Sequence, residues 1–393
     1  MSDPWLTIVG LTEDGLAGLS KASLAALERA EIIFGGARHL ALIDAGQRGM
    51  AWPIPFSIEP IMAQRGRNVV ALVSGDPFWF GAGSTLAGHL DPQEFQTLSA
   101  PSIFSLIAAH LGWPIQTTVC TALHAAPFEI LLPHLHRGTR IIATLRDARS
   151  ASELADWLTQ RGFGEFLLHI VERMGGAEQK ITSARADAVP RCDTDKLVAC
   201  AIEVAGAQGL PRGFGLSDER FASDGQITKR VIRAMTLSTL APRNDDLLWD
   251  LGAGSGSISV EWCLNGGRSI AVEQKASRVT NITENARRFG VEARLSVRLG
   301  DSIALCADLP DPDAVFIGGG ASAALIGAVV PRLKSGSRLV VNAVTLETEA
   351  VLIAEQAARG GRLMKIDVSE TEPLGRMRGW TAARPVVQWS YIR

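Results

Sequence analysis

Short apolar runs alternate with stretches of helical spacing along the whole chain. The segment Leu16–Ala30 has apolar residues at helical spacing and follows the first apolar run, Trp5–Val9. Further runs in this first series lie at Glu31–Phe34, Val69–Val73, Gly83–Leu90 and Ile141–Leu145. Alternating strand-like and helix-like segments predict an α/β fold.

The alternation breaks at Ala205–Ser217, a segment that is rich in glycine and contains a proline. Such composition is typical of a linker, so we predict two domains, residues 1–208 and 209–393. A second α/β series then begins with a helix over Thr228–Leu240. It continues with strands at Leu247–Leu251, Ser269–Glu273, Ala293–Leu299, Ala314–Ile317 and Arg338–Asn342, a helix at Ala276–Phe289, and two final strands at Leu363–Ser369 and Val386–Ile392 joined by a polar loop.

Composition narrows the class of protein. The chain has 393 residues, 47% of them apolar, and a formal net charge of -2. A balanced charge argues against general nucleic-acid binding, which needs a basic excess. The five cysteines lack CxxC spacing, which favours small buried thiols in a reducing compartment. No signal peptide or membrane span is apparent, so we expect a cytoplasmic location and no membrane partner.

The most informative motif lies at Leu247–Ser259, where an apolar strand runs through Asp250 into a glycine-rich turn and a helix. Glycines allow close approach of the backbone to a ligand at the carboxyl end of a strand. A dinucleotide motif needs a third glycine where this chain has Ser257, so we favour S-adenosylmethionine. The predicted cofactor contacts here are Asp250, Gly252, Ala253, Gly254, Ser255 and Gly256.

Two further strand ends carry groups suited to the same cofactor. Glu273 ends the next strand, about twenty residues on, where a carboxylate accepts hydrogen bonds from ribose hydroxyls. Asp301 and Ser302 follow the strand after that, where they can contact the adenine edge. A structural α/β domain with a glycine-rich turn is the plainer alternative.

Two loops of the second domain are candidates for substrate binding. Gly318, Gly319 and Gly320 leave room for a bulky ligand, or they form only a tight turn. In the last loop, Arg376 and Arg378 can pair with carboxylates and Trp380 can stack on a flat macrocycle. A solvated charged hairpin tip explains that loop equally well.

These motifs, with Gly225–Arg230 ahead of them, resemble the precorrin methyltransferases that methylate C15 and decarboxylate their substrate. The resemblance covers about Gly213 to the C-terminus and implies a Rossmann-like class I S-adenosylmethionine methyltransferase domain with a terminal antiparallel hairpin. It implies that Thr228 lies at the cofactor pocket together with the glycine turn, Glu273 and Ser302.

In the first domain a buried strand runs into Gly75, Asp76 and Pro77 and then an aromatic cluster, Phe78–Phe80. Alone, this is equally well an ordinary turn. Together with the segments Thr7–Gly10, Ala30–His39, Pro101–Pro114 and Glu172–Gln179, it resembles the tetrapyrrole methylase family over residues 4–205. The resemblance implies a two-lobed α/β fold with cofactor contacts at Gly75, Asp76, Pro77, Ser102 and Ile103.

The first domain departs from that family at two places. The loop after the first strand, Gly10–Gly15, lacks the usual central glycine and proline. A His-Gly-Arg run of close relatives is replaced by His124, Ala125 and Ala126, which removes one possible carboxylate clamp. The way in which a substrate lies here is therefore left open.

The tandem order resembles the precorrin-6Y C5,15-methyltransferase (decarboxylating) family. The resemblance implies S-adenosylmethionine as cofactor, a precorrin substrate, two methyl transfers at C5 and C15, loss of the C12 acetate carboxyl group, and a homo-oligomer. We see no catalytic triad or metal cluster, and we expect no metal. Two alternatives are a tRNA methyltransferase and a carrier of corrin intermediates with one inactive half.

Overall fold

The computed structural model describes residues 4–190, 198–206 and 209–393, and these form two compact units. Unit 1 comprises Met1–Ala126 and His134–Gln208, and unit 2 comprises Pro127–Pro133 and Gly209–Arg393. The boundary after Gln208 leaves one short segment of the first half, Pro127–Pro133, in the second unit. None of the described helices is long and apolar enough to cross a membrane.

The first lobe of unit 1 is a five-stranded parallel sheet in the order β3-β2-β4-β1-β5. Alternate residues of β1 enter separate apolar clusters, with Leu6 and Ile8 in one and Val9 and Leu11 in the other. Burial on both faces explains the continuous apolar runs of these strands. The elements are β1 (Leu6–Leu11), α1 (Lys21–Arg29), β2 (Ile32–Gly35), α2 (Ala37–Leu42), β3 (Gly49–Ala51), α3 (Glu59–Met62), β4 (Val69–Ser74), α4 (Gly83–Ala87) and β5 (Phe95–Leu98).

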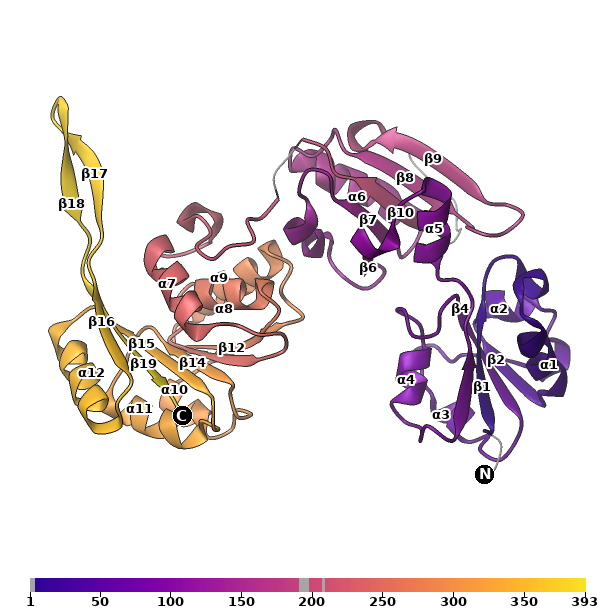
Figure 1. Cartoon of the computed structure of the whole chain (residues 1–393), viewed down its shortest axis with the longest axis horizontal. Coiled ribbons are helices and arrows are strands. Elements are labelled where there is room, and N and C mark those ends of the chain that lie inside the picture. The colour runs from indigo at the N-terminus through magenta and orange to yellow at the C-terminus, as the bar shows by residue number, and fades with distance from the viewer. Residues whose placement is uncertain (1–3, 191–197, 207–208) are drawn as a thin grey trace. The chain divides into compact units, whose positions relative to one another are not determined.

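The second lobe is a mixed five-stranded sheet in the order β6-β7-β10-β8-β9, in which only β6 and β7 pair in parallel. Its elements are α5 (Ile103–Leu111), β6 (Thr118–Ala122), β7 (Arg140–Thr144), α6 (Ala148–Gln160), β8 (Leu167–Glu172), β9 (Lys180–Arg185) and β10 (Val198–Glu203). Short 3-10 helices of this half lie at Gly15–Gly18, Gly46–Arg48, Ile115–Thr117, Phe128–His134 and Ala186–Ala188. The expected two-lobed α/β architecture is confirmed (Figure 1).

The predicted helix over Leu16–Ala30 is wrong at its start. A 3-10 turn ends at Gly18, and α1 begins only at Lys21. Ser20 is the N-cap residue that fixes the start of α1. Its hydroxyl accepts a hydrogen bond from the Ser23 N–H at 3.1 Å. Apolar periodicity alone does not locate such a cap.

Unit 2 is built on a seven-stranded sheet in the order β13-β12-β11-β14-β15-β19-β16. The first five strands are parallel, and strand order reverses between β11 and β14, where ligands bind in open α/β sheets. The elements up to β15 are α7 (Arg230–Leu240), β11 (Leu247–Leu251), α8 (Ser257–Leu264), β12 (Arg268–Glu273), α9 (Ala276–Arg288), β13 (Leu295–Leu299), α10 (Ser302–Cys306), β14 (Ala314–Ile317), α11 (Ala323–Val329) and β15 (Arg338–Ala343), with 3-10 turns at Asp218–Arg220 and Val330–Arg332.

The end of the chain forms the antiparallel edge expected of this fold. After α12 (Leu346–Arg359), β16 (Arg362–Ile366) and β19 (Val386–Ile392) pair antiparallel, and β19 lies between β16 and β15. The predicted polar loop between them is wrong. It is a two-stranded ribbon, β17 (Ser369–Leu374) and β18 (Met377–Ala382), that extends from the sheet (Figure 1).

The predicted linker, Ala205–Ser217, extends into unit 2, and its part from Gly209 onward is more than a linker. Leu210 and Leu216 are 4% and 3% exposed and join the apolar cluster beneath α7 and α8. Leu132, from the segment that unit 2 takes from the first half, packs on the same cluster, and its carbonyl accepts from the Leu210 N–H at 3.2 Å. Buried leucines among the glycines therefore anchor this segment to the core.

Candidate active sites

The glycine turn of unit 2 lies at the carboxyl end of β11, beside the loop that follows β14. Gly252 has φ +72°, and a Cβ there would lie 2.4 Å from the Gly319 carbonyl oxygen. A side chain at this position would therefore collide with backbone and adopt a left-handed conformation that favours glycine. The contact brings the turn after β11 against the predicted substrate loop, Gly318–Gly320.

Glu273 fastens the glycine turn to the end of β12. Its carboxylate is 5% exposed; Oε2 accepts from the Gly254 N–H at 2.9 Å and Oε1 from the Lys275 N–H at 3.0 Å. A carboxylate offers about four lone-pair sites, so each oxygen retains capacity for a further donor. The carboxylate is thus held at the position where a ribose is expected.

Asp250 lies beneath the turn. It is fully buried, and its Oδ2 accepts from the N–H and the hydroxyl of Ser259 at 3.2 and 2.7 Å. Burial raises the pKa of this carboxyl to about 6, the Ser259 hydrogen bonds oppose the rise, and the negative charge of Glu273 adds to it. Asp250 Oδ1 and Ser255 Oγ are buried without a hydrogen-bond partner among the described residues.

Asp301 and Ser302 stand at the start of α10. Asp301 caps that helix through a 3.0 Å bond from the Ala304 N–H and accepts from Gln274 Nε2 at 2.8 Å. The Gly300 N–H donates to the Glu273 carbonyl at 3.0 Å, so this strand end adjoins the preceding one. The structure therefore brings the ends of β11, β12 and β13 together, as predicted.

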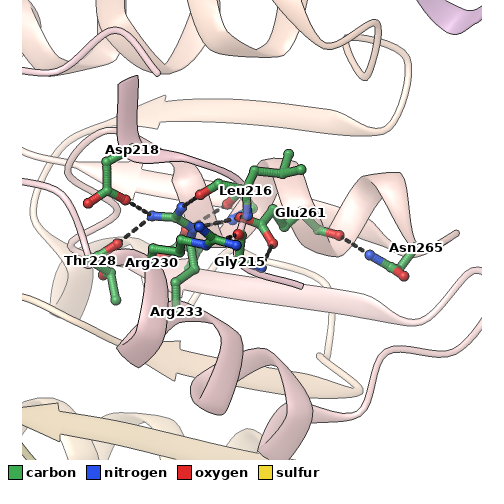
Figure 2. Close-up of polar contacts among 10 residues, drawn as sticks. Gly215, Leu216, Asp218, Thr228, Arg230, Arg233, Glu261 and Asn265 are labelled. Carbon is green, nitrogen blue, oxygen red and sulfur yellow. Dashed lines mark hydrogen bonds and ion pairs between the residues drawn. The ribbon is translucent and has the colours of Figure 1, made fainter. Parts of the chain in front are cut away.

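A buried arginine that the sequence analysis missed organises the segment ahead of α7 (Figure 2). Arg233 is 0% exposed; its Nε donates to Glu261 Oε1 at 2.6 Å and its Nη1 to Asp218 Oδ1 at 2.9 Å. It also donates to the carbonyl oxygens of Thr228 and Leu216. The helical spacing of Arg233 with Leu237 and Leu240, which share the buried face of α7, was the available clue.

This network sets the backbone next to the glycine turn. Glu261 accepts from the N–H groups of Gly215 and Leu216 at 2.6 and 3.0 Å, which offsets its buried charge (Figure 2). The Gln226 carbonyl oxygen, two residues before Thr228, would lie 3.2 Å from a Cβ on Gly254. The predicted helix start at Thr228 is wrong by two residues, because α7 begins at Arg230 and Thr228 precedes it.

The other predicted substrate residues lie on the terminal ribbon. Arg376 follows the turn glycine Gly375, Arg378 pairs with Pro373 across the ribbon, and Trp380 pairs with Thr371. All three are exposed, Trp380 at 77%. In the described part of the chain, no hydrogen bond or ion pair joins them to the glycine turns.

In unit 1 the turn after β4 meets the start of α5. Gly75 has φ +57°, and a Cβ there would lie 2.9 Å from the Pro101 carbonyl oxygen and 3.0 Å from the Ser102 Cα. Ser102 caps α5 by accepting from the Ser105 N–H at 3.1 Å, and Ile103 is the first residue of that helix. The predicted residues on the two segments are therefore neighbours.

Aromatic packing holds the rest of this turn. Asp76 Oδ1 accepts from the Phe78 N–H at 2.9 Å, and buried Pro77 follows it. Trp79 then stacks on Phe104 of α5 with ring centroids 5.1 Å apart. Trp79 nevertheless remains 36% exposed, so an aromatic surface lies next to the turn.

Comparisons with known proteins agree with this division. Residues 6–190 match the family model of tetrapyrrole (corrin/porphyrin) methylases, and residues 219–393 match that of the precorrin methyltransferase domain. The chain is 44% identical over 400 residues to the precorrin-6Y C(5,15)-methyltransferase (decarboxylating) of Sinorhizobium sp, which covers 99% of this chain and 97% of that protein.

Two shorter relatives each match less than half of the chain. A probable cobalt-precorrin-6B C(15)-methyltransferase (decarboxylating) of Pyrobaculum calidifontis is 34% identical over 44% of this chain and 92% of its own length. The cobalt-precorrin-7 C(5)-methyltransferase of Salmonella typhimurium is 31% identical over 45% of this chain and 88% of its own. With similarity to the Sinorhizobium protein along nearly its whole length, this chain belongs to the precorrin-6Y C(5,15)-methyltransferase (decarboxylating) family.

Proposed function

We propose that this protein methylates precorrin-6B at C5 and C15 with S-adenosylmethionine and removes the C12 acetate carboxyl group as CO2, giving precorrin-8. The observation that carries the proposal is the full-length match to a decarboxylating C(5,15)-methyltransferase. It is supported by glycine turns at the carboxyl end of a parallel strand in both units, at Gly75 and at Gly252.

In unit 2 the cofactor contacts are assigned to the turn and the three strand ends around it. Glu273 accepts the ribose hydroxyls, and Asp301 and Ser302 contact the adenine. The methionine part lies along Gly252–Gly256, beside Thr228 and above Asp250. The unpartnered Ser255 Oγ and Asp250 Oδ1 fit a polar ligand, because buried polar atoms without partners are costly.

In unit 1 the cofactor is assigned to Gly75, Asp76 and Pro77 on one side and Ser102 and Ile103 on the other. The left-handed Gly75 and the capped start of α5 support a ligand held against backbone. Exposed Trp79 offers a face for stacking beside it.

The substrate contacts of unit 2 are assigned to Gly318, Gly319 and Gly320 and to the ribbon residues Arg376, Arg378 and Trp380. The glycines adjoin the donor turn through the Gly252–Gly319 contact. Guanidinium groups on an extended ribbon suit the carboxylates of a polyacid, and an exposed indole suits a flat macrocycle.

S-adenosylmethionine supplies an electrophilic sulfonium methyl group when it is bound. The protein orients the nucleophilic meso carbon in line with that methyl and excludes water. In the decarboxylation a C–C bond breaks, CO2 leaves, and the conjugated macrocycle accepts the electron pair. We assign C15 methylation and decarboxylation to unit 2 and C5 methylation to unit 1, which agrees with relatives of about half length that carry one activity each.

Mass spectrometry of the products formed from precorrin-6B and S-adenosylmethionine tests the proposal. We expect a gain of two methyl groups and the loss of one CO2. Titration calorimetry of the full chain with S-adenosylmethionine should give two sites. If precorrin-6B gains no methyl group, or if only added tRNA is methylated, the proposed function is contradicted.

A further inference from the structure

Two arginines lie on segments of unit 1 that both adjoin Glu13, in the loop after β1. Arg38, on α2 just after β2, forms an ion pair with Glu13 from the loop after β1. Its Nη2 is 2.9 Å from His39 Nε2 and 3.3 Å from the Ser74 hydroxyl. Ser74 directly precedes Gly75, so the guanidinium lies next to the proposed donor turn.

The second arginine comes from the other lobe of the same unit. Arg173, with φ +47°, begins the turn after β8. That turn lies against the first loop, because a Cβ on Gly176 would be 2.8 Å from the Cβ of Glu13. Burial lowers the pKa of Arg38, and the positive charge of Arg173 lowers it further, so the two cations repel each other.

Each arginine already has a carboxylate partner, so a ligand carboxylate would compete with Glu13 at Arg38 and with Glu178 at Arg173. Burial, and then the charge of Arg38, lower the pKa of His39 to about 4, so His39 is neutral at neutral pH and accepts from Arg38. Glu178 pairs with Arg173 but is 62% exposed, where an ion pair contributes little. The Arg38 side chain is 37% exposed and thus open to a ligand, whereas its partner Glu13 is only 9% exposed.

We propose that Arg38 and Arg173 bind a carboxylate side chain of the tetrapyrrole in unit 1, and that this carboxylate displaces Glu13 from Arg38. The proposal rests on the proposed function, which supplies a polyacidic substrate. A guanidinium binds a carboxylate through two parallel hydrogen bonds, so the pair would orient the macrocycle beside the donor turn.

The test measures C5 and C15 methylation separately by mass spectrometry with the full chain, precorrin-6B and S-adenosylmethionine. Arg38→Ala and Arg173→Ala should each raise the KM for the tetrapyrrole in C5 methylation by about 10–100-fold, the loss expected for a charged hydrogen bond. The KM for S-adenosylmethionine and C15 methylation should not change. Arg38→Lys should retain part of the affinity, and it keeps the test open if the alanine variant fails to fold.

Glu13→Gln separates binding from a structural role. Without its charge Arg38 is free for the substrate, so the KM for the tetrapyrrole in C5 methylation should fall. If the Glu13–Arg38 pair only braces the loop, Glu13→Gln should instead impair C5 methylation as Arg38→Ala does, which would overturn the proposal. Arg67→Ala is the matched control, because Arg67 pairs with Glu31 ahead of β4, at the far end of the same strand from Ser74.

An unchanged KM in Arg38→Ala, or an equal rise in the KM for S-adenosylmethionine, would also overturn the carboxylate site while leaving the proposed function intact. A wild-type chain that never methylates C5 would overturn both.

Discussion

The two proposed donor turns are fixed by different forces. In unit 2, Glu273 accepts the backbone N–H of Gly254, and Asp250 lies buried beneath the turn. In unit 1, Gly75 packs directly on the backbone of Pro101, and Trp79 stacks on Phe104. Both turns pack closely on backbone, at Gly319 and at Pro101, but buried carboxylates are added in unit 2 and stacked rings in unit 1.

Under the proposed function, the same sulfonium donor binds in two pockets that are built differently. A buried carboxylate pairs with backbone donors and still offers acceptors to a ligand, but it makes the turn sensitive to charge. A packed turn offers backbone groups and an aromatic face, and it is sensitive to changes in side-chain volume. We expect substitutions to affect the two turns differently.

Reciprocal loss of one methylation is the largest expected effect. Gly254→Arg places a long side chain in the cofactor space of unit 2 and should lower C15 methylation by about 100-fold or more, as misplaced reactants do. C5 methylation should persist. Asp76→Arg should have the reverse effect. The products are distinguished by mass spectrometry of fragments.

Circular dichroism of both variants tests whether they remain folded. If either folded variant loses both methylations, the two turns are not independent sites, and the comparison between them fails.

Removal of Arg233 should destabilise unit 2 alone. Arg233→Met leaves Glu261 buried without its charge partner, for which a cost of about 3–5 kcal/mol is expected. Hydrogen exchange followed by mass spectrometry should show faster exchange in unit 2 peptides and unchanged exchange in unit 1. Arg287→Met, which breaks an exposed pair with Glu284, is the control and should have little effect.

The buried carboxyl group of Asp250 should also make the free energy of unfolding of unit 2 depend on pH. The folded pKa of Asp250 is about 6 against an ordinary 3.8. The folded state therefore binds the proton more tightly, and stability falls as pH rises from about 4 to about 6. This difference in pKa corresponds to a change of about 3 kcal/mol in the free energy of unfolding. Asp250→Asn should remove this part of the pH dependence, because an amide does not titrate. The amide oxygen can still accept from Ser259, so the hydrogen bond is kept.

Urea unfolding of both proteins between pH 3.5 and 7 measures the difference. Equal pH slopes for wild type and Asp250→Asn would show that the carboxyl is not perturbed by its burial.

The sequence sufficed for the features that depend on local pattern. Apolar runs located β11, β14 and β19 because most residues of these strands are apolar and buried, although β11 contains Asp250 and β19 contains Gln388. The glycine turn at Gly252 and the acidic strand end at Glu273 were visible from spacing. The α/β fold class followed from the alternation, and the structure confirms it.

Features that depend on distant partners were not predictable. The spacing of Arg233 with Leu237 and Leu240 hints at a buried position, but its partner Glu261 is 28 residues away along the chain and could not be predicted. The β17–β18 ribbon has no buried face, since all residues of β17 are exposed, so its sequence shows no alternation of apolar and polar residues and resembled a loop. Leu132 packs on the apolar core of unit 2, although four strands, β7 to β10, separate it along the chain from Leu210.

The smallest effect should come from the packed turn of unit 1. Trp79→Ala removes the ring stacked on Phe104, and an aromatic pair contributes about 0.5–1.5 kcal/mol. We expect the KM for S-adenosylmethionine in C5 methylation to rise about 2–10-fold, with no change at C15. Trp79→Phe should restore most of the affinity, and the effect should not depend on salt, because no charge is removed.

Phe78→Ala is the matched control, since Phe78 is 47% exposed on the same turn and no ring contact is described for it. If Phe78→Ala and Trp79→Ala impair C5 methylation equally, exposed apolar area and not the stack on α5 holds this turn.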